Sequence, residues 1–169
     1  IVSEIIPVFS RRSIFGYKFI AFSSLAIAFF GSLVWAHHMF TAGMSDTAQF
    51  VFSFITYVVS IPSAIKVFNW ISTMYKGSIK ADPPFLYVMS FIVQFSIGGF
   101  TGLMLGALSV NIHLQDTSFV VAHFHYVMFG GTGFGIFAAM HYWLPKMFGR
   151  MYNLKVATWA WAIVTIGYN

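Results

Sequence analysis

The feature that most restricts the fold of this chain is a series of long apolar segments. About 20 apolar residues are needed to cross a hydrocarbon core about 30 Å thick. Because no backbone polar group can stay unpaired in lipid, such segments form α-helices. We therefore predict an all-α, polytopic transmembrane helix bundle. Its five spans run from about Tyr17 to Trp35, Ala48 to Tyr75, Phe85 to Leu108 and Ser118 to Met147, and from Leu154 onward.

The composition agrees with a bilayer as the solvent. Only 8% of the residues are charged and 59% are hydrophobic, whereas about a quarter of the residues of a soluble domain are charged. The formal net charge of +5 is explained by basic loops, so no nucleic-acid partner is expected. Cysteine is absent, which excludes disulfide frameworks, thiolate metal sites and iron–sulfur clusters and leaves histidine as the main soft ligand.

The basic residues alternate between connections. Lysine and arginine collect in short cytoplasmic-side loops. Here they precede the first span and lie between the second and third spans and between the fourth and fifth, while connections 37–47 and 109–117 contain none. The alternation supports the predicted number of spans. It places His37, His38, His113 and Asp116 near the same outer side of the membrane.

Two histidines are embedded in the fourth span, in the sequence DTSFVVAHFHY. His123 and His125 are expected roughly 8–11 Å below its outer end, at 1.5 Å per residue. Residues two apart on a helix point about 200° apart, so these side chains should bind on opposite flanks. Imidazole is a common axial ligand of haem iron, which predicts one helix holding two haems with Phe124 between the ligands. The alternative is that each histidine donates a hydrogen bond to a neighbouring helix.

Adjacent histidines end the first span, in the sequence WAHHMF. His37 and His38 can converge on one metal ion if a third ligand comes from elsewhere, and imidazole nitrogen suits copper, zinc and iron. The pattern therefore indicates a copper site. The alternative is a solvent-exposed pair at the membrane surface.

A lysine lies inside the second span, in the sequence IPSAIKVFNW. Lys66 is about nine residues, or roughly 14 Å, from the basic-side end of that span. Ser63 and Asn69 stand three residues to either side and Ser60 is nearby, so these side chains can supply the hydrogen bonds of a proton path. The alternative is that Lys66 pairs with a carboxylate on a helix outside this chain.

These three motifs, in this order and at these separations, resemble the latter half of subunit I of haem-copper terminal oxidases of the mitochondrial-like class. The resemblance extends over essentially the whole chain. It implies that the chain is part of a subunit of roughly twelve helices. It also fits a chain that starts at Ile1 without Met and ends at Asn169 inside an apolar run, and residues 1–169 are expected to be one partial domain, truncated at both ends.

The resemblance implies a role for each singled-out residue. His37 and His38 correspond to two ligands of the copper in the binuclear centre, His123 to the ligand of the high-spin haem iron and His125 to the ligand of the low-spin haem iron. Lys66 matches the lysine of a proton channel, and Ser63 stands where a threonine is usual. Asp116 matches an acidic residue near a magnesium site, but Gln115 replaces the usual histidine before it. His113 and His141 match no ligand, and His113 is interpreted as a loop residue and His141 as structural.

The implied activity is the reduction of dioxygen to water by a respiratory oxidase that translocates protons. The implied cofactors are two a-type haems, copper and magnesium. The implied partners are oxidase subunits II and III. Asp116 and Tyr126 resemble the cytochrome c oxidases rather than the bo-type quinol oxidases, which favours cytochrome c as electron donor over quinol. The expected location is the bacterial cytoplasmic membrane or the mitochondrial inner membrane.

Two rival functions stay open at the level of sequence. A metal-free proton-coupled transporter would use Lys66 and the embedded histidines as relays, but it does not explain two histidines spaced two apart on one helix. A haem-iron nitric oxide reductase of the same superfamily would generally lack the channel lysine. Visible absorption would distinguish the oxidase from the transporter, and copper analysis would distinguish it from the reductase.

Overall fold

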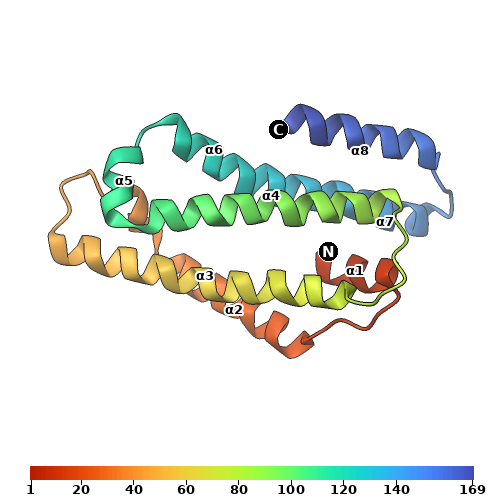
Figure 1. Ribbon diagram of the computed structural model, residues 1–169, viewed down its shortest axis with the longest axis horizontal. Helices are drawn as coiled ribbons and strands as arrows, with labels where there is room; N and C mark the ends of the chain where they lie inside the picture. The colour runs from red at the N-terminus through yellow and green to blue at the C-terminus, as the bar shows by residue number, and fades with distance from the viewer. The chain divides into compact units, whose positions relative to one another are not determined.

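The computed structural model describes residues 1–169, and all of its regular structure is helical (Figure 1). The order of elements is α1 (Val2–Ser10), α2 (Tyr17–Leu33), the 3₁₀ helix η1 (Trp35–Met39), α3 (Asp46–Met74), α4 (Pro83–Gly106), α5 (Leu108–Leu114), α6 (Ser118–Val127), the π-helix η2 (Met128–Gly133), α7 (Phe134–Phe148) and α8 (Leu154–Tyr168).

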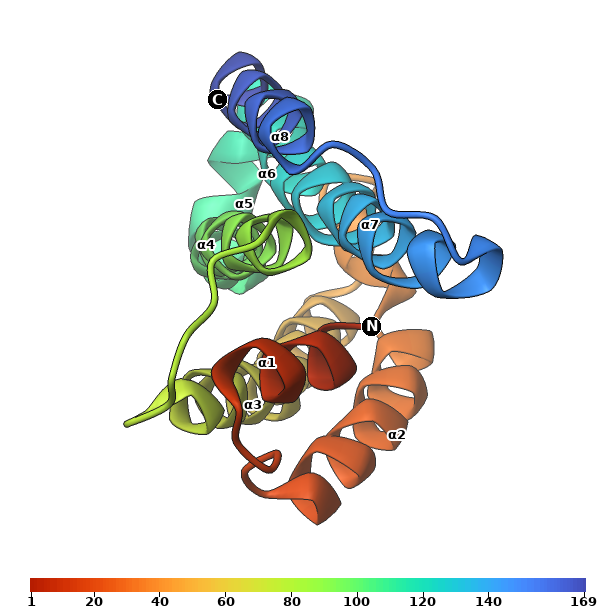
Figure 2. The same ribbon diagram turned by 90° about the vertical axis from the view of Figure 1, so that its right-hand side faces the viewer.

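The helices contribute to two compact units. The first unit comprises Ile1–Phe15, Trp70–Phe95 and Val127–Asn169, and the second comprises Gly16–Asn69 and Ser96–Tyr126. In the second unit α2 lies beside α3 (Figures 1 and 2). In the first unit α8 follows α7 after the short connection 149–153. The embedded histidines at 37, 38, 123 and 125 all belong to the second unit.

Four stretches are long and apolar enough to cross a membrane: Tyr17–Met39, Asp46–Met74, Pro83–Gly106 and Ser118–Phe148. These confirm the first four predicted spans. The fifth predicted span falls on α8, a helix of 15 residues that runs to Tyr168, and this helix is not among the four stretches of membrane length. One face of α2 presents Phe19, Phe22, Leu25 and Phe29 with 62–69% of their surface exposed, as expected of side chains that face lipid.

Two short helices lie outside the predicted spans. α1 precedes the first span, and α5 lies in the connection between the third and fourth spans. α5 is held against the end of α4 because the buried Asn111 side-chain nitrogen donates to the Leu105 carbonyl over 2.8 Å. Neither helix has the length of a membrane span, which is why hydropathy did not indicate them.

The connections meet in the pairs that the loop charges predicted. In the second unit, Gln115 Nε2 donates to the His38 carbonyl over 3.1 Å, which joins the two connections that lack basic residues. In the first unit, Arg12 Nη2 donates to the Lys76 carbonyl over 2.7 Å, and the Lys80 amide donates to the Phe9 carbonyl over 2.9 Å. The connection before α2 therefore contacts the connection between α3 and α4, and both are basic. The two connections without basic residues contact each other.

Glycines let α4 and η2 approach each other closely in the first unit. A Cβ atom on Gly130 would stand 2.6 Å from Gln94 Cβ, and one on Gly131 would stand 3.5 Å from the Phe95 ring. Both glycines are buried. The glycines in the middle of the fourth span therefore allow close helix approach.

Gly130→Ala is expected to lower the stability of the full-length protein. The added methyl group has no room, and overpacking of this kind costs about 1–3 kcal/mol. The measurement is the midpoint of thermal unfolding in detergent. Gly99→Ala on α4 is the control, because a Cβ there meets nothing within 4 Å. An unchanged midpoint for Gly130→Ala would contradict the tight contact.

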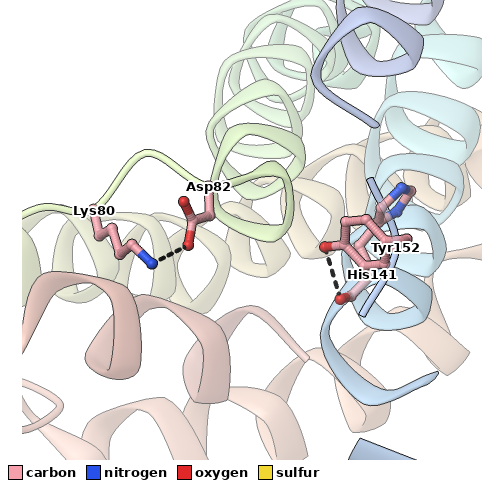
Figure 3. Close-up of polar contacts among 4 residues, drawn as sticks. All are labelled: Lys80, Asp82, His141 and Tyr152. Carbon is pink, nitrogen blue, oxygen red and sulfur yellow. Dashed lines mark hydrogen bonds and ion pairs between the residues drawn. The ribbon is translucent and has the colours of Figure 1, made fainter. Parts of the chain in front are cut away.

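A polar cluster in the first unit ties the loop after α7 to that helix (Figure 3). Tyr152 Oη donates to the His141 carbonyl over 3.0 Å, and the Tyr152 ring packs edge-on against the His141 imidazole with centroids 5.0 Å apart. Lys80 Nζ pairs with Asp82 Oδ2 at 2.7 Å. Burial raises the pKa of Tyr152 to about 12, and the charges of Asp82 and Tyr87 add to that shift.

Tyr152 is therefore expected to stay protonated well above pH 10. Its pKa in the folded protein exceeds the unfolded value of about 10, so the stabilisation from the neutral phenol is complete below pH 10 and is lost as the pH rises through about 12. Phenolate absorbance at 295 nm of wild type minus Tyr152→Phe should stay near zero up to about pH 11. A step in this difference near pH 10 would contradict the burial of Tyr152.

Candidate metal centre

The two adjacent histidines converge on one point. They lie on η1, at the outer end of the first span, and their side chains turn toward each other although adjacent residues of a 3₁₀ helix point about 120° apart. The Nε2 atoms of His37 and His38 are 2.9 Å apart, and their ring centroids are 4.2 Å apart. Metal–imidazole bonds of about 2.0–2.1 Å that meet at roughly 90° put two nitrogens about 2.9 Å apart. The spacing of the pair therefore fits two ligands of one metal ion.

A hydroxyl on α3 sets the tautomer of His37. Thr56 Oγ1 donates to the Phe52 carbonyl over 2.6 Å and lies 3.0 Å from His37 Nδ1. Because the hydroxyl proton is already used, the His37 Nδ1–H is the donor of the second contact. His37 Nε2 then carries a lone pair and faces His38. Metal-binding imidazoles typically hold their second ring nitrogen in such a contact.

His123 is oriented from α4. Its Nδ1 lies 3.0 Å from the Gly98 carbonyl, which can only accept, so Nδ1 carries the proton and Nε2 carries a lone pair. Thr101 Oγ1 is 3.1 Å from the same nitrogen. A Cβ on Gly102 would stand 2.9 Å from His123 Cε1, so the ring occupies space that only glycine leaves. His123 also interacts electrostatically with His37, as does His38.

His125 is exposed and takes the same tautomer. Its Nδ1 donates to the Val121 carbonyl, four residues earlier on α6, over 2.8 Å. The Phe124 ring stacks on the His125 ring with centroids 4.6 Å apart. His123 thus contacts α4 while His125 is exposed on α6, and each presents an Nε2 lone pair, which is what an axial ligand of haem iron requires.

The histidine pair does not complete a metal site by itself. No three His, Cys, Asp or Glu side chains of residues 1–169 gather around one point. Two neutral imidazoles are suitable ligands for copper, but a further ligand has to come from outside this chain. The predicted copper ligands His37 and His38 and the predicted haem ligand His123 lie in one neighbourhood of the second unit.

Lys66 lies between two helices of the second unit. Its Nζ donates to Ser24 Oγ on α2 over 3.0 Å, and Ser24 Oγ in turn donates to the Ile20 carbonyl over 2.9 Å. Ser63 Oγ donates to the Val59 carbonyl over 3.2 Å. Sequence reasoning expected partners for Lys66 on its own helix, whereas Ser24 comes from the neighbouring one.

Asp116 lies in the connection between α5 and α6. It is exposed, and its backbone is in the left-handed region, with φ 62°. Gln115 uses its amide nitrogen to hold the His38 carbonyl, so its oxygen is the atom left for a hard cation. His113 is exposed at the end of α5.

Several residues of the site were missed at the level of sequence. Thr56, Thr101 and Ser24 are single hydroxyls in apolar helices, and their partners are 19, 22 and 42 residues away in the chain. Spacing offered one signal. Thr56, Ser63 and Lys66 are seven and then three residues apart, which places them along one face of a helix.

The whole chain, residues 1–169, matches the family model described as "Cytochrome C and Quinol oxidase polypeptide I". It is 44% identical over 169 residues to cytochrome c oxidase subunit 1 of Synechocystis sp. (strain ATCC 27184 / PCC 6803 / Kazusa), covering 100% of this chain and 31% of that relative. It is 46% identical to cytochrome c oxidase subunit 1 of Bacillus sp. (strain PS3) and 45% identical to quinol oxidase subunit 1 of Bacillus subtilis (strain 168), covering all of this chain and 27% and 26% of those relatives.

The chain thus spans less than a third of the length of the relatives it matches. The match nevertheless extends over every residue of the chain, and the four membrane-length helices agree with a multi-pass membrane protein. The chain therefore belongs to the haem-copper oxidase subunit I family, that is, to polypeptide I of the cytochrome c and quinol oxidases.

Proposed function

We propose that this chain is the part of a terminal oxidase subunit I that holds the two haems and two ligands of the copper. The observation that carries the proposal is the pair of Nε2 atoms of His37 and His38, 2.9 Å apart, in the same neighbourhood as the His123 imidazole. Membership of the oxidase family supports it. Residues 1–169 would then be one part of a larger catalytic domain.

Each histidine has one role in this proposal. His37 and His38 hold the copper ion, His123 holds the high-spin haem iron and His125 holds the low-spin haem iron. When bound, these groups supply the four-electron reduction of dioxygen to water. The residues around them prepare the ligands: Thr56 keeps the proton of His37 on Nδ1, and the Gly98 carbonyl does the same for His123. The Nε2 atoms of His37 and His123 therefore carry the lone pairs that a metal ion needs before any metal binds.

Lys66 is proposed to carry protons toward the site from the basic side of the membrane. Ser63 and Thr56 follow Lys66 along one face of α3, and Thr56 contacts His37. The distance from Lys66 to Thr56 is about 15 Å along the helix axis. Ser24 accepts a hydrogen bond from the Lys66 ammonium and holds it between α2 and α3. Water molecules would have to bridge these side chains.

Lys66→Met in the full-length oxidase is expected to lower oxygen consumption on the order of 100-fold, the lower end of what a positioned proton-transfer group contributes. The haem and copper contents should stay at wild-type levels, because Lys66 holds no metal in this proposal. Lys155→Met is the matched control, since Lys155 is an exposed lysine in the first turn of α8. Full turnover in Lys66→Met would exclude Lys66 from the proton path.

The proposed electron donor is cytochrome c, and the proposed partners are oxidase subunits II and III. Asp116 and Tyr126 favour cytochrome c at the level of sequence. Quinol is the second candidate, because quinol oxidase subunit 1 of Bacillus subtilis (strain 168) is 45% identical to this chain. Oxidation of reduced cytochrome c and of a quinol by the purified complex distinguishes the two. Magnesium at Asp116 is proposed with Gln115 as the neighbouring oxygen ligand.

The proposal is tested by a reduced-minus-oxidised visible spectrum of the full-length protein, recorded with and without carbon monoxide, and by copper quantification on the same preparation. Two haems, of which one binds carbon monoxide, together with copper are the expected result. Haem absorption without copper would favour a haem-iron reductase of the same superfamily. An assembled protein without haem would overturn the proposal.

A further inference from the structure

Gly102 on α4 leaves the space that the His123 imidazole occupies in the second unit. A Cβ atom at position 102 would stand 2.9 Å from His123 Cε1, 3.7 Å from Nδ1 and 3.8 Å from Nε2. All three atoms belong to the ring, and real Cβ atoms essentially never stand within 3.0 Å of another such atom. Any side chain at position 102 would therefore displace the imidazole or move α4 away from α6.

The imidazole has little freedom to yield. Its Nδ1–H has two acceptors on α4, the Gly98 carbonyl at 3.0 Å and Thr101 Oγ1 at 3.1 Å. Thr101 Oγ1 is fixed in turn, because it lies 3.1 and 3.0 Å from the carbonyls of Ile97 and Gly98, which can only accept its proton. Gly98 and Gly102 stand four residues apart, on the same face of α4. A ring pushed away from position 102 would therefore lose both acceptors together.

We infer that Gly102 is a positioning residue for His123, and that its missing side chain lets α4 supply both hydrogen-bond acceptors to the imidazole. The inference rests on the proposed function, in which His123 holds the iron of the high-spin haem. A hydrogen bond from the second ring nitrogen fixes the orientation of a metal-binding imidazole and raises its basicity. Gly102 has no side chain that could bind a metal, so it acts on the strength of the bond that His123 makes.

The same helix offers two matched comparisons for Gly102→Ala. Gly106 stands one turn further along the same face of α4, and a Cβ there would meet Thr56 Cγ2 at 3.3 Å instead of an imidazole. A Cβ on Gly99 would meet nothing within 4 Å. Gly106→Ala therefore adds a methyl group at a second tight contact, and Gly99→Ala adds one without a contact. A general effect of alanine in α4 would appear in these variants too, whereas an effect on His123 is expected from Gly102→Ala alone.

The test is the resonance Raman spectrum of the reduced full-length protein, in which the stretching vibration between haem iron and histidine reports the strength of that bond. In Gly102→Ala this band should move to lower frequency or be lost. Oxygen consumption should fall by about 10–100-fold, as is typical when a supporting contact of a metal ligand is removed. Gly106→Ala and Gly99→Ala should keep the wild-type band. An unchanged band in assembled Gly102→Ala, or the same shift in Gly106→Ala, would overturn the proposal.

Two further variants complete the test. Thr101→Val keeps the branched shape of the side chain and removes one acceptor of His123 Nδ1, so the band should move in the same direction. If Gly102→Ala does not assemble, Thr101→Val decides the question, and an unchanged band there would overturn the proposal. In His123→Leu the band should disappear. A band that survives in His123→Leu would mean that the proposed function fails and this inference with it, whereas a band lost there but unchanged in Gly102→Ala would contradict this inference alone.

Discussion

His38→Leu in the full-length oxidase is expected to remove the copper and to abolish oxygen consumption, while the haem spectrum stays close to wild type. His38 supplies one of the two Nε2 atoms that face each other across 2.9 Å. Leucine has a similar volume but no nitrogen lone pair. The variant therefore lacks one of the two copper ligands proposed in this chain. Neither proposed haem ligand lies on η1, which is why the haems should remain.

The measurement is metal analysis of the purified complex together with the visible spectrum and an oxygen electrode. His113→Leu is the control, since His113 is an exposed histidine at the end of α5 and outside the metal centre. It should keep wild-type copper and turnover. Copper at wild-type level in His38→Leu would show that His38 is not a ligand, and the surface-pair interpretation of these residues would then be preferred.

Thr56→Val is expected to have a smaller effect of the same kind. It removes the acceptor that holds the His37 proton on Nδ1. Loss of such a supporting contact typically lowers metal affinity or activity by about 10–100-fold. Reduced copper occupancy with intact haem is the expected outcome.

His123→Leu and His125→Leu are expected to separate the two haems spectroscopically. His123→Leu should abolish carbon monoxide binding and turnover, because His123 is the proposed ligand of the iron that meets the gas. His125→Leu should remove the haem signal that does not respond to carbon monoxide. In both cases replacement of the imidazole leaves the rest of α6 unchanged.

The measurement is the carbon monoxide difference spectrum of each full-length variant. His141→Leu is the control for loss of an embedded histidine, because His141 Nδ1 also donates to a carbonyl four residues earlier, over 2.8 Å, yet no ligand role is proposed for it. It should keep both haem signals. If His123→Leu retained a carbon monoxide complex, the two haem assignments would have to be exchanged or abandoned.

Length and hydropathy predicted most of the fold, because a bilayer leaves few alternatives to the helix. The four spans appear within a few residues of the predicted bounds. The short helices α1 and α5 and the π-helix η2 did not follow from the pattern. η2 interrupts the regular α-helical hydrogen bonding between α6 and α7. The hydropathy of the sequence does not change there. Its only trace in the sequence is the run of glycines from Gly130 to Gly135.

The candidate site was predictable where chemistry is carried by rare residues. His37, His38, His123 and Lys66 stand out in apolar segments because embedded ionisable groups are costly. The hydroxyl and carbonyl groups that orient them do not stand out. Gly98 acts through its backbone, and Ser24 reaches Lys66 from 42 residues away. Such contacts are set by the packing of helices, which spacing along one helix does not reveal.

α3 joins two tasks in one continuous helix. Thr56 contacts the imidazole of His37, a proposed copper ligand, and Lys66, about 15 Å further along the axis, is hydrogen-bonded to α2. Any tilt or rotation of α3 would move both contacts together. Pro62 lies between the two residues and removes one backbone hydrogen bond of α3. A bend of α3 at Pro62 is therefore the motion that would move one of the two contacts without the other.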